Sequence, residues 1–202
     1  MGLYQCRSLA DGLDAAVRLV RLGELNPDIR SVVADEIKCA SRLRHKNIVP
    51  CIGFGDFDDW AYIAEKSGQG RSLVEHMERR ANLGKPFKPV EAFSLLSHVC
   101  NAIQYSTDQR GHGALMASQI VINSNGRVQV GGFGFSRLRS EIKSGSNWDL
   151  GCLASSYESV AAADLASLAV IAGQLLTGTP WPNGLAQPPI DTNTLIVEKL
   201  QE

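Results

Sequence analysis

The sequence predicts an α+β protein in which a small sheet with one helix precedes a mainly helical remainder. Short apolar runs bounded by turn residues recur in positions 1–66, a pattern typical of strands. Other segments repeat apolar residues at three- and four-residue intervals, which is typical of amphipathic helices. A chain of 202 residues with 44% hydrophobic content is long enough for one domain or a compact pair.

The first part begins with two expected strands, 3–7 and 15–20, separated by the turn Ala10-Asp11-Gly12. Asn26-Pro27-Asp28 has the composition of a helix start. The helix is expected over 29–43, because its apolar residues fall on one face.

Two further strands are expected in this part, 48–52 and 60–64. The residues between them, 53–59, are rich in Gly and Asp, which is typical of a hairpin loop. These elements together form the predicted small sheet with one helix.

The second part is expected to contain helices over 72–81, 90–107 and 161–177. Strands at 120–122 and 127–130 flank an Asn-Gly pair, which is a strong hairpin signal. The last helix should end at Gly178-Thr179-Pro180, because Gly followed by Pro is a common helix terminus.

The charge balance excludes a dominant polyelectrolyte function. With 20 basic and 21 acidic residues the net charge is −1, whereas nucleic acid binding usually leaves a basic excess. The five cysteines form no metal-type or Cys-x-x-Cys pair, which favours free thiols in a reducing compartment. No secretory signal is visible, and the apolar run 160–176 contains Asp164, so we expect a buried helix rather than a membrane span. The expected location is the cytoplasm.

Several short sequence motifs occur in a fixed order along the chain. They are Ala15-Ala16-Val17-Arg18, Glu36-Ile37, Leu43-Arg44-His45-Lys46-Asn47-Ile48-Val49, His112-Gly113-Ala114-Leu115-Met116-Ala117-Ser118-Gln119-Ile120-Val121-Ile122, Gly132-Phe133-Gly134, Asp164-Leu165-Ala166-Ser167-Leu168-Ala169-Val170 and Leu175-Leu176-Thr177-Gly178-Thr179-Pro180. In order and spacing they resemble the eukaryotic-type (Hanks-type) Ser/Thr protein kinase domain.

The resemblance implies a two-lobed kinase-like fold. Residues 1–66 would be the N-lobe, a small β-sheet with one αC-like helix, and residues 67–202 the mainly helical C-lobe. The first strand and most of the Gly-rich loop would be missing, and the C-terminal helices incomplete, so the resemblance implies a domain truncated at both ends.

The resemblance also shows which catalytic groups are replaced. Ala114 stands at the position of the catalytic base and Met116 at that of a lysine near the transferred phosphoryl group. Gln119 and Gly132 stand at the two metal-ligand positions, and Arg18 at that of the nucleotide-binding lysine. Alanine cannot accept a proton, and a glycine with a neutral amide offers Mg²⁺ no charge. A guanidinium keeps its charge but not the geometry of an ammonium.

Positions that are architectural in the family are retained, and burial in any core would explain most of them equally well. They are Glu36, His112, Phe133, Glu158 and Asp164. We expect a structural salt bridge between Arg18 and Glu36. By resemblance, the candidate nucleotide pocket comprises Leu3, Ala16, Arg18 and Val121.

The favoured function is that of a pseudokinase, a catalytically inactive module that binds protein partners in signalling. The alternatives are an active or atypical ATP-dependent Ser/Thr kinase and a non-functional fragment of a kinase domain. No cofactor is assigned, ATP is left open, Mg²⁺ is not expected, and neither nucleic acid nor a membrane span is expected.

Overall fold

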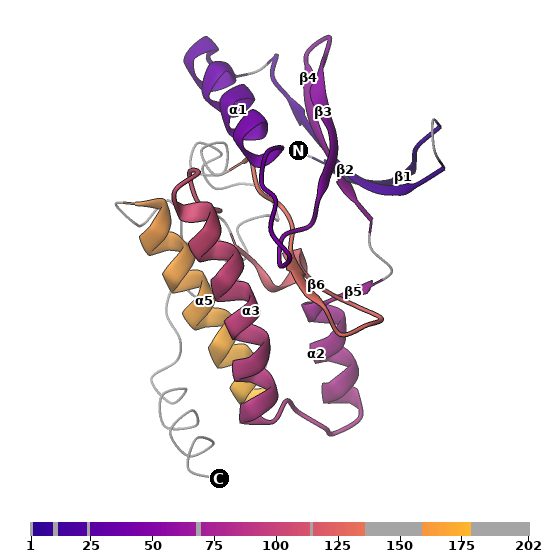
Figure 1. Ribbon diagram of the computed structural model, residues 1–202, viewed down its shortest axis with the longest axis vertical. Coiled ribbons are helices and arrows are strands. Elements are labelled where there is room, and N and C mark those ends of the chain that lie inside the picture. Colours follow the sequence, from indigo (N-terminus) through magenta and orange to yellow (C-terminus); the bar gives the residue numbers. More distant parts are fainter. Residues whose placement is uncertain are drawn as a thin grey trace.

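The computed structural model describes residues 2–9, 12–23, 25–67, 70–113, 115–135 and 159–178. In these residues an antiparallel sheet with one helix lies next to a mainly helical part that carries a second, smaller sheet (Figure 1). This α+β arrangement is the predicted fold class.

The larger sheet has the strand order β1-β2-β4-β3. Its strands are β1 (Gly2–Arg7), β2 (Asp14–Arg21), β3 (Cys51–Phe57) and β4 (Trp60–Lys66). All three pairings are antiparallel, and β2 pairs with β4 so that Arg18 lies opposite Ile63 and Ala16 opposite Glu65. Directly paired residues share one face of a sheet, so Glu65 is on the face of Ala16. Ala16 and Arg18 are two residues apart on β2 and share that face, so Arg18 and Glu65 lie on the same face.

The prediction for β3 was wrong at both ends. Residues 53–57, expected in a loop, are strand, and only Asp58 and Asp59 make the turn. Ile48, expected in that strand, instead forms an isolated bridge with Val130. Gly and Asp favour loops, but Phe54 and Phe57 alternate with them, and pairing with β4 along the strand overrides the local preference.

Helix α1 (Pro27–Ala40) begins where the sequence predicted. Asn26 is the N-cap, and its side-chain oxygen accepts a hydrogen bond from the Asp28 N–H at 3.0 Å. The helix ends at Ala40 rather than at residue 43, although Leu43 is still buried.

The second part begins with the short strand β5 (Gly70–Ser72), which the sequence did not predict, and helix α2 (Leu73–Asn82). Ser72 and Glu75 form a reciprocal capping box at the start of α2. Helix α3 (Pro89–Thr107) follows after a short connection.

The smaller sheet has the order β5-β6-β7. A 3-10 turn, η1 (Ala117–Gln119), precedes β6 (Ile120–Asn123), which pairs with β7 (Val128–Val130). The predicted hairpin turn is present, with Gly126 at a φ of 75°, a conformation that glycine adopts without strain.

Helix α5 (Val160–Thr177) runs alongside α3 (Figure 1). Its length and composition alone would allow it to cross a membrane. It nevertheless packs on α3 and buries Asp164 and Ser167, which is typical of a core helix. Gly178 ends it in the left-handed conformation with a φ of 66°, as predicted.

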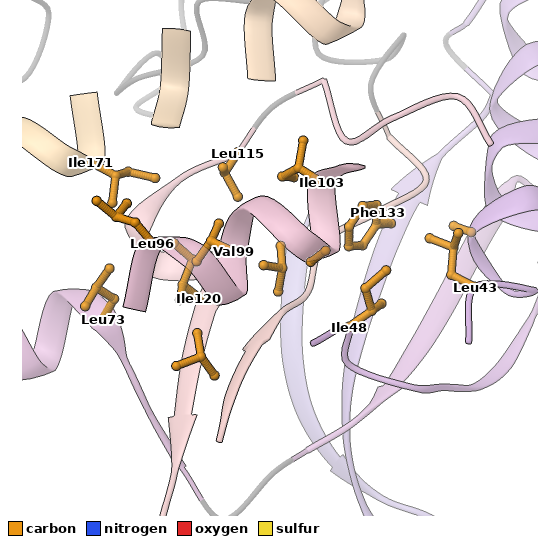
Figure 2. Packing of buried hydrophobic residues seen from close by; sticks show 14 of the residues in the cluster. Leu43, Ile48, Leu73, Leu96, Val99, Ile103, Leu115, Ile120, Phe133 and Ile171 are labelled. Carbon is orange, nitrogen blue, oxygen red and sulfur yellow. The ribbon is translucent and has the colours of Figure 1, made fainter. Parts of the chain in front are cut away.

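A continuous apolar core joins the helices to the smaller sheet (Figure 2). Its fully buried side chains come from α1, β4, α2, α3, the loop before η1, β6, β7 and α5, and they include Leu73, Val99, Leu115, Ile120 and Ile171. This core holds the backbone around residues 112–119 and 130–135, where the candidate site lies.

Candidate functional site

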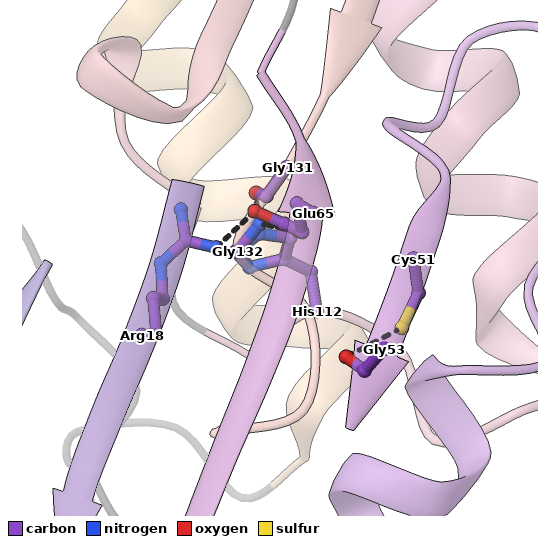
Figure 3. Close-up of polar contacts among 7 residues, drawn as sticks. All are labelled: Arg18, Cys51, Gly53, Glu65, His112, Gly131 and Gly132. Atoms are coloured by element: carbon purple, nitrogen blue, oxygen red, sulfur yellow. Dashed lines mark hydrogen bonds and ion pairs between the residues drawn. The ribbon is translucent and has the colours of Figure 1, made fainter. Parts of the chain in front are cut away.

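The centre of the site is a buried ion pair between β2 and β4. The Nη1 of Arg18 donates a hydrogen bond to Oε2 of Glu65 (Figure 3). Arg18 is 8% exposed and Glu65 5% exposed. At such burial an ion pair is weakly screened by salt, and loss of either partner leaves an uncompensated charge.

This pairing corrects the expected salt bridge between Arg18 and Glu36. Glu36 is buried on α1, but in the described part of the chain the acid bonded to Arg18 is Glu65. The strand register gives the reason, because it places Glu65 on the same face of the sheet as Arg18, two residue pairs along the ladder.

Glu65 also connects the larger sheet to the segment after β7. Its Oε1 accepts a hydrogen bond from the Gly132 N–H at 2.7 Å. One carboxylate is therefore bound by a guanidinium through one oxygen and by a backbone N–H through the other. The replaced lysine and aspartate positions, Arg18 and Gly132, are joined through Glu65.

The two expected metal-ligand positions, Gln119 and Gly132, do lie side by side. The side-chain Oε1 of Gln119 accepts a hydrogen bond from the Met116 N–H at 2.8 Å. Its Nε2 lies 2.6 Å from the point where a Cβ on residue 132 would stand. The Gln119 amide thus fills the space that a side chain at position 132 would need. Gly132, with a φ of 92°, has no side chain to compete for that space.

The Gln119 Nε2 is itself buried and has no hydrogen-bond partner among the described residues. A buried donor without a partner is costly, by about 1–3 kcal/mol. Because an N–H donor repels a cation, it is also unsuited to bind one.

His112 and Phe133, two of the retained architectural positions, are in edge-to-face contact with ring centroids 4.5 Å apart. The His112 Nε2 lies 3.0 Å from the Gly131 carbonyl oxygen. Both side chains are buried. These contacts join the loop at residue 112 to the segment at 131–133, so His112 acts here as a packing and hydrogen-bonding residue.

Asp164 of α5 anchors the same loop. Its two carboxylate oxygens accept hydrogen bonds from the backbone N–H groups of His112, at 2.9 Å, and Gly113, at 2.7 Å. Burial raises the pKa of Asp164 to about 6, although both hydrogen bonds act to lower it. Desolvation of the charged form therefore outweighs the hydrogen bonds.

The candidate nucleotide-pocket residues come from both sheets. Leu3 pairs with Arg18 across β1 and β2, and its side chain is half exposed. Ala16 is partly buried on β2, and Val121 is partly buried on β6 in the smaller sheet. Ala114 and Glu158, at the base position and at the retained glutamate position, lie outside the described residues.

Cys51 lies directly across the β3–β4 ladder from Glu65. Its thiol donates a hydrogen bond to the Gly53 carbonyl oxygen at 3.3 Å (Figure 3). Burial, together with the nearby Glu65 charge, raises the pKa of Cys51. The thiol therefore stays protonated near neutral pH and is not an activated nucleophile.

Residues 2–160 match the model of the protein tyrosine and serine/threonine kinase family. The chain belongs to the protein kinase family. The solved structures agree on the fold: the kinase domain of Mycobacterium tuberculosis PknI superposes with a TM-score of 0.73 at 20% identity, covering 96% of this chain and 75% of that one.

Curated relatives match over part of their own length. The probable serine/threonine-protein kinase PknB of Corynebacterium glutamicum is 31% identical over 139 residues, which are 66% of this chain and 21% of PknB. The Aurora kinase of Schizosaccharomyces pombe is 26% identical over 186 residues, which are 88% of this chain and 51% of that kinase. The chain thus spans about half or less of these relatives.

The cofactors implied by the family are a nucleotide and Mg²⁺, and the residues present do not fit the metal. Mg²⁺ requires oxygen ligands, usually one or two carboxylates together with phosphate oxygens. In the described residues no group of three His, Cys, Asp or Glu side chains is placed to hold a metal ion. The one carboxylate bonded to Gly132, that of Glu65, is already paired with Arg18.

Sequence reasoning missed Glu65, although a signal was present. In Trp60–Lys66, Ala61, Ile63 and Glu65 alternate on one face of the strand, and all three are buried. A charged residue that falls on the same strand face as buried apolar residues is expected to be buried and paired with an opposite charge.

Proposed function

We propose that this protein is a pseudokinase, a kinase-fold module that does not transfer phosphate and acts in the cytoplasm as a binding partner in signalling. The observation that carries the proposal is the double role of Glu65. Its carboxylate pairs with Arg18 and accepts a hydrogen bond from the Gly132 N–H. The residue at the position where the family uses lysine, Arg18, is therefore bound by a carboxylate of the same chain.

Phosphoryl transfer depends on positioned phosphates, bound metal ions and an acceptor for the hydroxyl proton. In this chain Arg18 is already neutralised by an internal carboxylate. Gln119 presents its carbonyl oxygen to the Met116 N–H instead of to a metal. Ala114 offers no proton acceptor. Together these features support a loss of catalysis with retention of the fold.

The same contacts support a stable module without nucleotide. Glu65, His112 and Asp164 each bond to backbone groups of another element. The packing that surrounds a kinase active site is therefore held by protein groups alone. A partner protein is then the natural ligand of such a module.

The test is transfer of labelled γ-phosphate from ATP, with Mg²⁺ or Mn²⁺, to the protein itself and to a generic protein substrate. We expect no incorporation by the wild type, and none by Ala114→Asp, because the metal positions stay neutral. Arg18→Lys is the control for contaminating kinases, since it would alter transfer by this chain alone. Incorporation that changes in Arg18→Lys would contradict the proposal.

A further inference from the structure

A basic groove lies where α2 ends and α3 begins, with a volume of about 710 Å³. Half of its lining side chains are cationic, namely Arg79, Arg80, Lys85 and Lys88, and the other four are one histidine, two apolar residues and one acid: His76, Leu83, Pro86 and Glu91. Such a charge excess contrasts with the net charge of −1 of the whole chain.

Arg80 forms the rigid base of the groove. It binds the Glu91 carboxylate through two hydrogen bonds, of 2.8 and 3.1 Å. Its guanidinium also lies over the Phe87 ring, 4.1 Å from the centroid. The bond to Arg80, followed by that from the Lys88 N–H, lowers the pKa of Glu91 to about 2. The one acid of the groove is therefore engaged, and it fixes the loop between the helices.

Three cations of the groove are exposed and outside any ion pair of the described residues. Arg79, Lys85 and Lys88 are exposed, and none has an ion pair in the part of the chain that the structure describes. Lys88 is also the N-cap of α3, where the helix dipole adds positive potential. The side chain of Leu83, 60% exposed, and that of Pro86 give the same groove an apolar wall.

We propose that this groove binds an acidic peptide segment of a protein partner. Its carboxylates or phosphates would pair with Arg79, Lys85 and Lys88, and an apolar side chain would pack on Leu83 and Pro86. Charge complementarity selects the anion, and the apolar wall favours a peptide over a nucleic acid. The inference rests on the proposed function, because it names the surface and the chemistry of the partner.

The test is fluorescence anisotropy with the full 202-residue chain and labelled peptides. One peptide alternates Asp and Glu with Leu, a second replaces the acids by phosphoserine, and a third replaces them by Asn and Gln. We expect both acidic peptides to bind, the neutral one not to bind, and binding to weaken steeply as NaCl is raised to about 0.5 M. The stronger of the two acidic peptides identifies the preferred anion.

The double variant Arg79→Glu/Lys85→Glu should weaken binding at least about tenfold, because reversed charges repel the peptide. The matched control is Lys46→Glu/Arg127→Glu, which reverses two exposed charges outside the groove and should leave affinity unchanged. Circular dichroism checks that all variants fold, and unchanged affinity in a folded groove variant overturns the proposal. Equal binding of the neutral peptide, or tighter binding of a single-stranded RNA, also overturns it.

The phosphate-transfer assay is independent of this result. Phosphate transfer by a chain that binds acidic peptides at the groove would contradict the proposed pseudokinase function and still support the proposed peptide site. Absence of both transfer and peptide binding would contradict the groove alone.

Discussion

At the scale of single residues, the stability of the site depends on the Arg18–Glu65 pair. Arg18→Ala would leave the buried Glu65 carboxylate with the Gly132 N–H and no countercharge. We expect the free energy of unfolding to fall by about 3–5 kcal/mol. Urea denaturation followed by tryptophan fluorescence measures this change.

The control for that substitution is Arg7→Ala, which breaks the exposed pair of Arg7 and Asp14 and should cost less than about 1 kcal/mol. The double variant Arg18→Met/Glu65→Leu should recover most of the lost stability, because apolar side chains of similar volume remove the buried charges. Equal, small effects of Arg18→Ala and Arg7→Ala would show that the buried pair is not formed.

A second residue-scale prediction concerns the contact of Gly132 with Gln119. Gly132→Asp should destabilise the protein by more than the roughly 1–3 kcal/mol of backbone strain expected at a positive φ, because its Cβ would lie 2.6 Å from the Gln119 Nε2. In a Gln119→Ala background the cost should drop by about 0.5–3 kcal/mol. A double-mutant cycle in urea gives the coupling.

Gly126→Asp is the matched control for the cycle. Gly126 also has a positive φ, of 75°, but nothing lies within 4 Å of its hypothetical Cβ. Its cost should be the same with or without Gln119. Additive costs for Gly132→Asp and Gln119→Ala would refute the steric account of the site.

At the scale of elements, Asp164 links α5 to the loop at His112 and Gly113. Its folded pKa of about 6 exceeds the ordinary value of 3.8, so the folded state binds the proton more tightly than the unfolded state does. The contribution of this group to stability is complete below pH 3.8 and is lost as the pH rises through 6. A difference of this size corresponds to about 3 kcal/mol.

The comparison with Asp164→Asn isolates this effect. The variant loses one of the two oxygens that accept the His112 and Gly113 N–H groups, but its neutral amide carries no charge into the core at any pH. The stability lost in Asp164→Asn should therefore be largest near about pH 4 and shrink toward about pH 7. Thermal unfolding across this range tests the sign: a cost that grows with pH would show that the two backbone hydrogen bonds outweigh desolvation.

The elements also show what the sequence could predict. Helices α1, α2, α3 and α5 were found, because their periodicity and their caps at Asn26, Ser72 and Gly178 are local signals. Strand β3 was misjudged, because its Gly and Asp residues favour a loop and only pairing with β4 makes them a strand. Strand β5 has three residues and exists through its pairing with β6.

The site was predictable in its missing groups but not in its contacts. The replacements at Gln119 and Gly132 are predictions from the resemblance to the kinase domain, whereas the Arg18–Glu65 pair depends on the register between β2 and β4. The sequence does not reveal such a register, and the resemblance to the family predicts Glu36 as the partner of Arg18 instead. The contact of Gln119 with the space above Gly132 likewise depends on tertiary packing.

At the scale of the whole molecule, side-chain contacts within the chain connect the larger sheet to the segment after β7 at the candidate site. The Arg18–Glu65 pair, the bond from Gly132 and the Gln119 amide lie at the positions that the resemblance assigns to the nucleotide-binding lysine and the metal ligands. The two parts of the chain are thereby linked without a ligand.

The most direct test of this account is the unfolding temperature of the protein with ATP, with and without Mg²⁺. A ligand at 100 times its Kd adds about 2.7 kcal/mol of stability, which shifts the unfolding temperature measurably. The account predicts no additional shift when Mg²⁺ joins ATP, because within the described residues the carboxylate at Gly132 is that of Glu65, which is already paired with Arg18. A clear Mg²⁺-dependent rise in the wild type would contradict it.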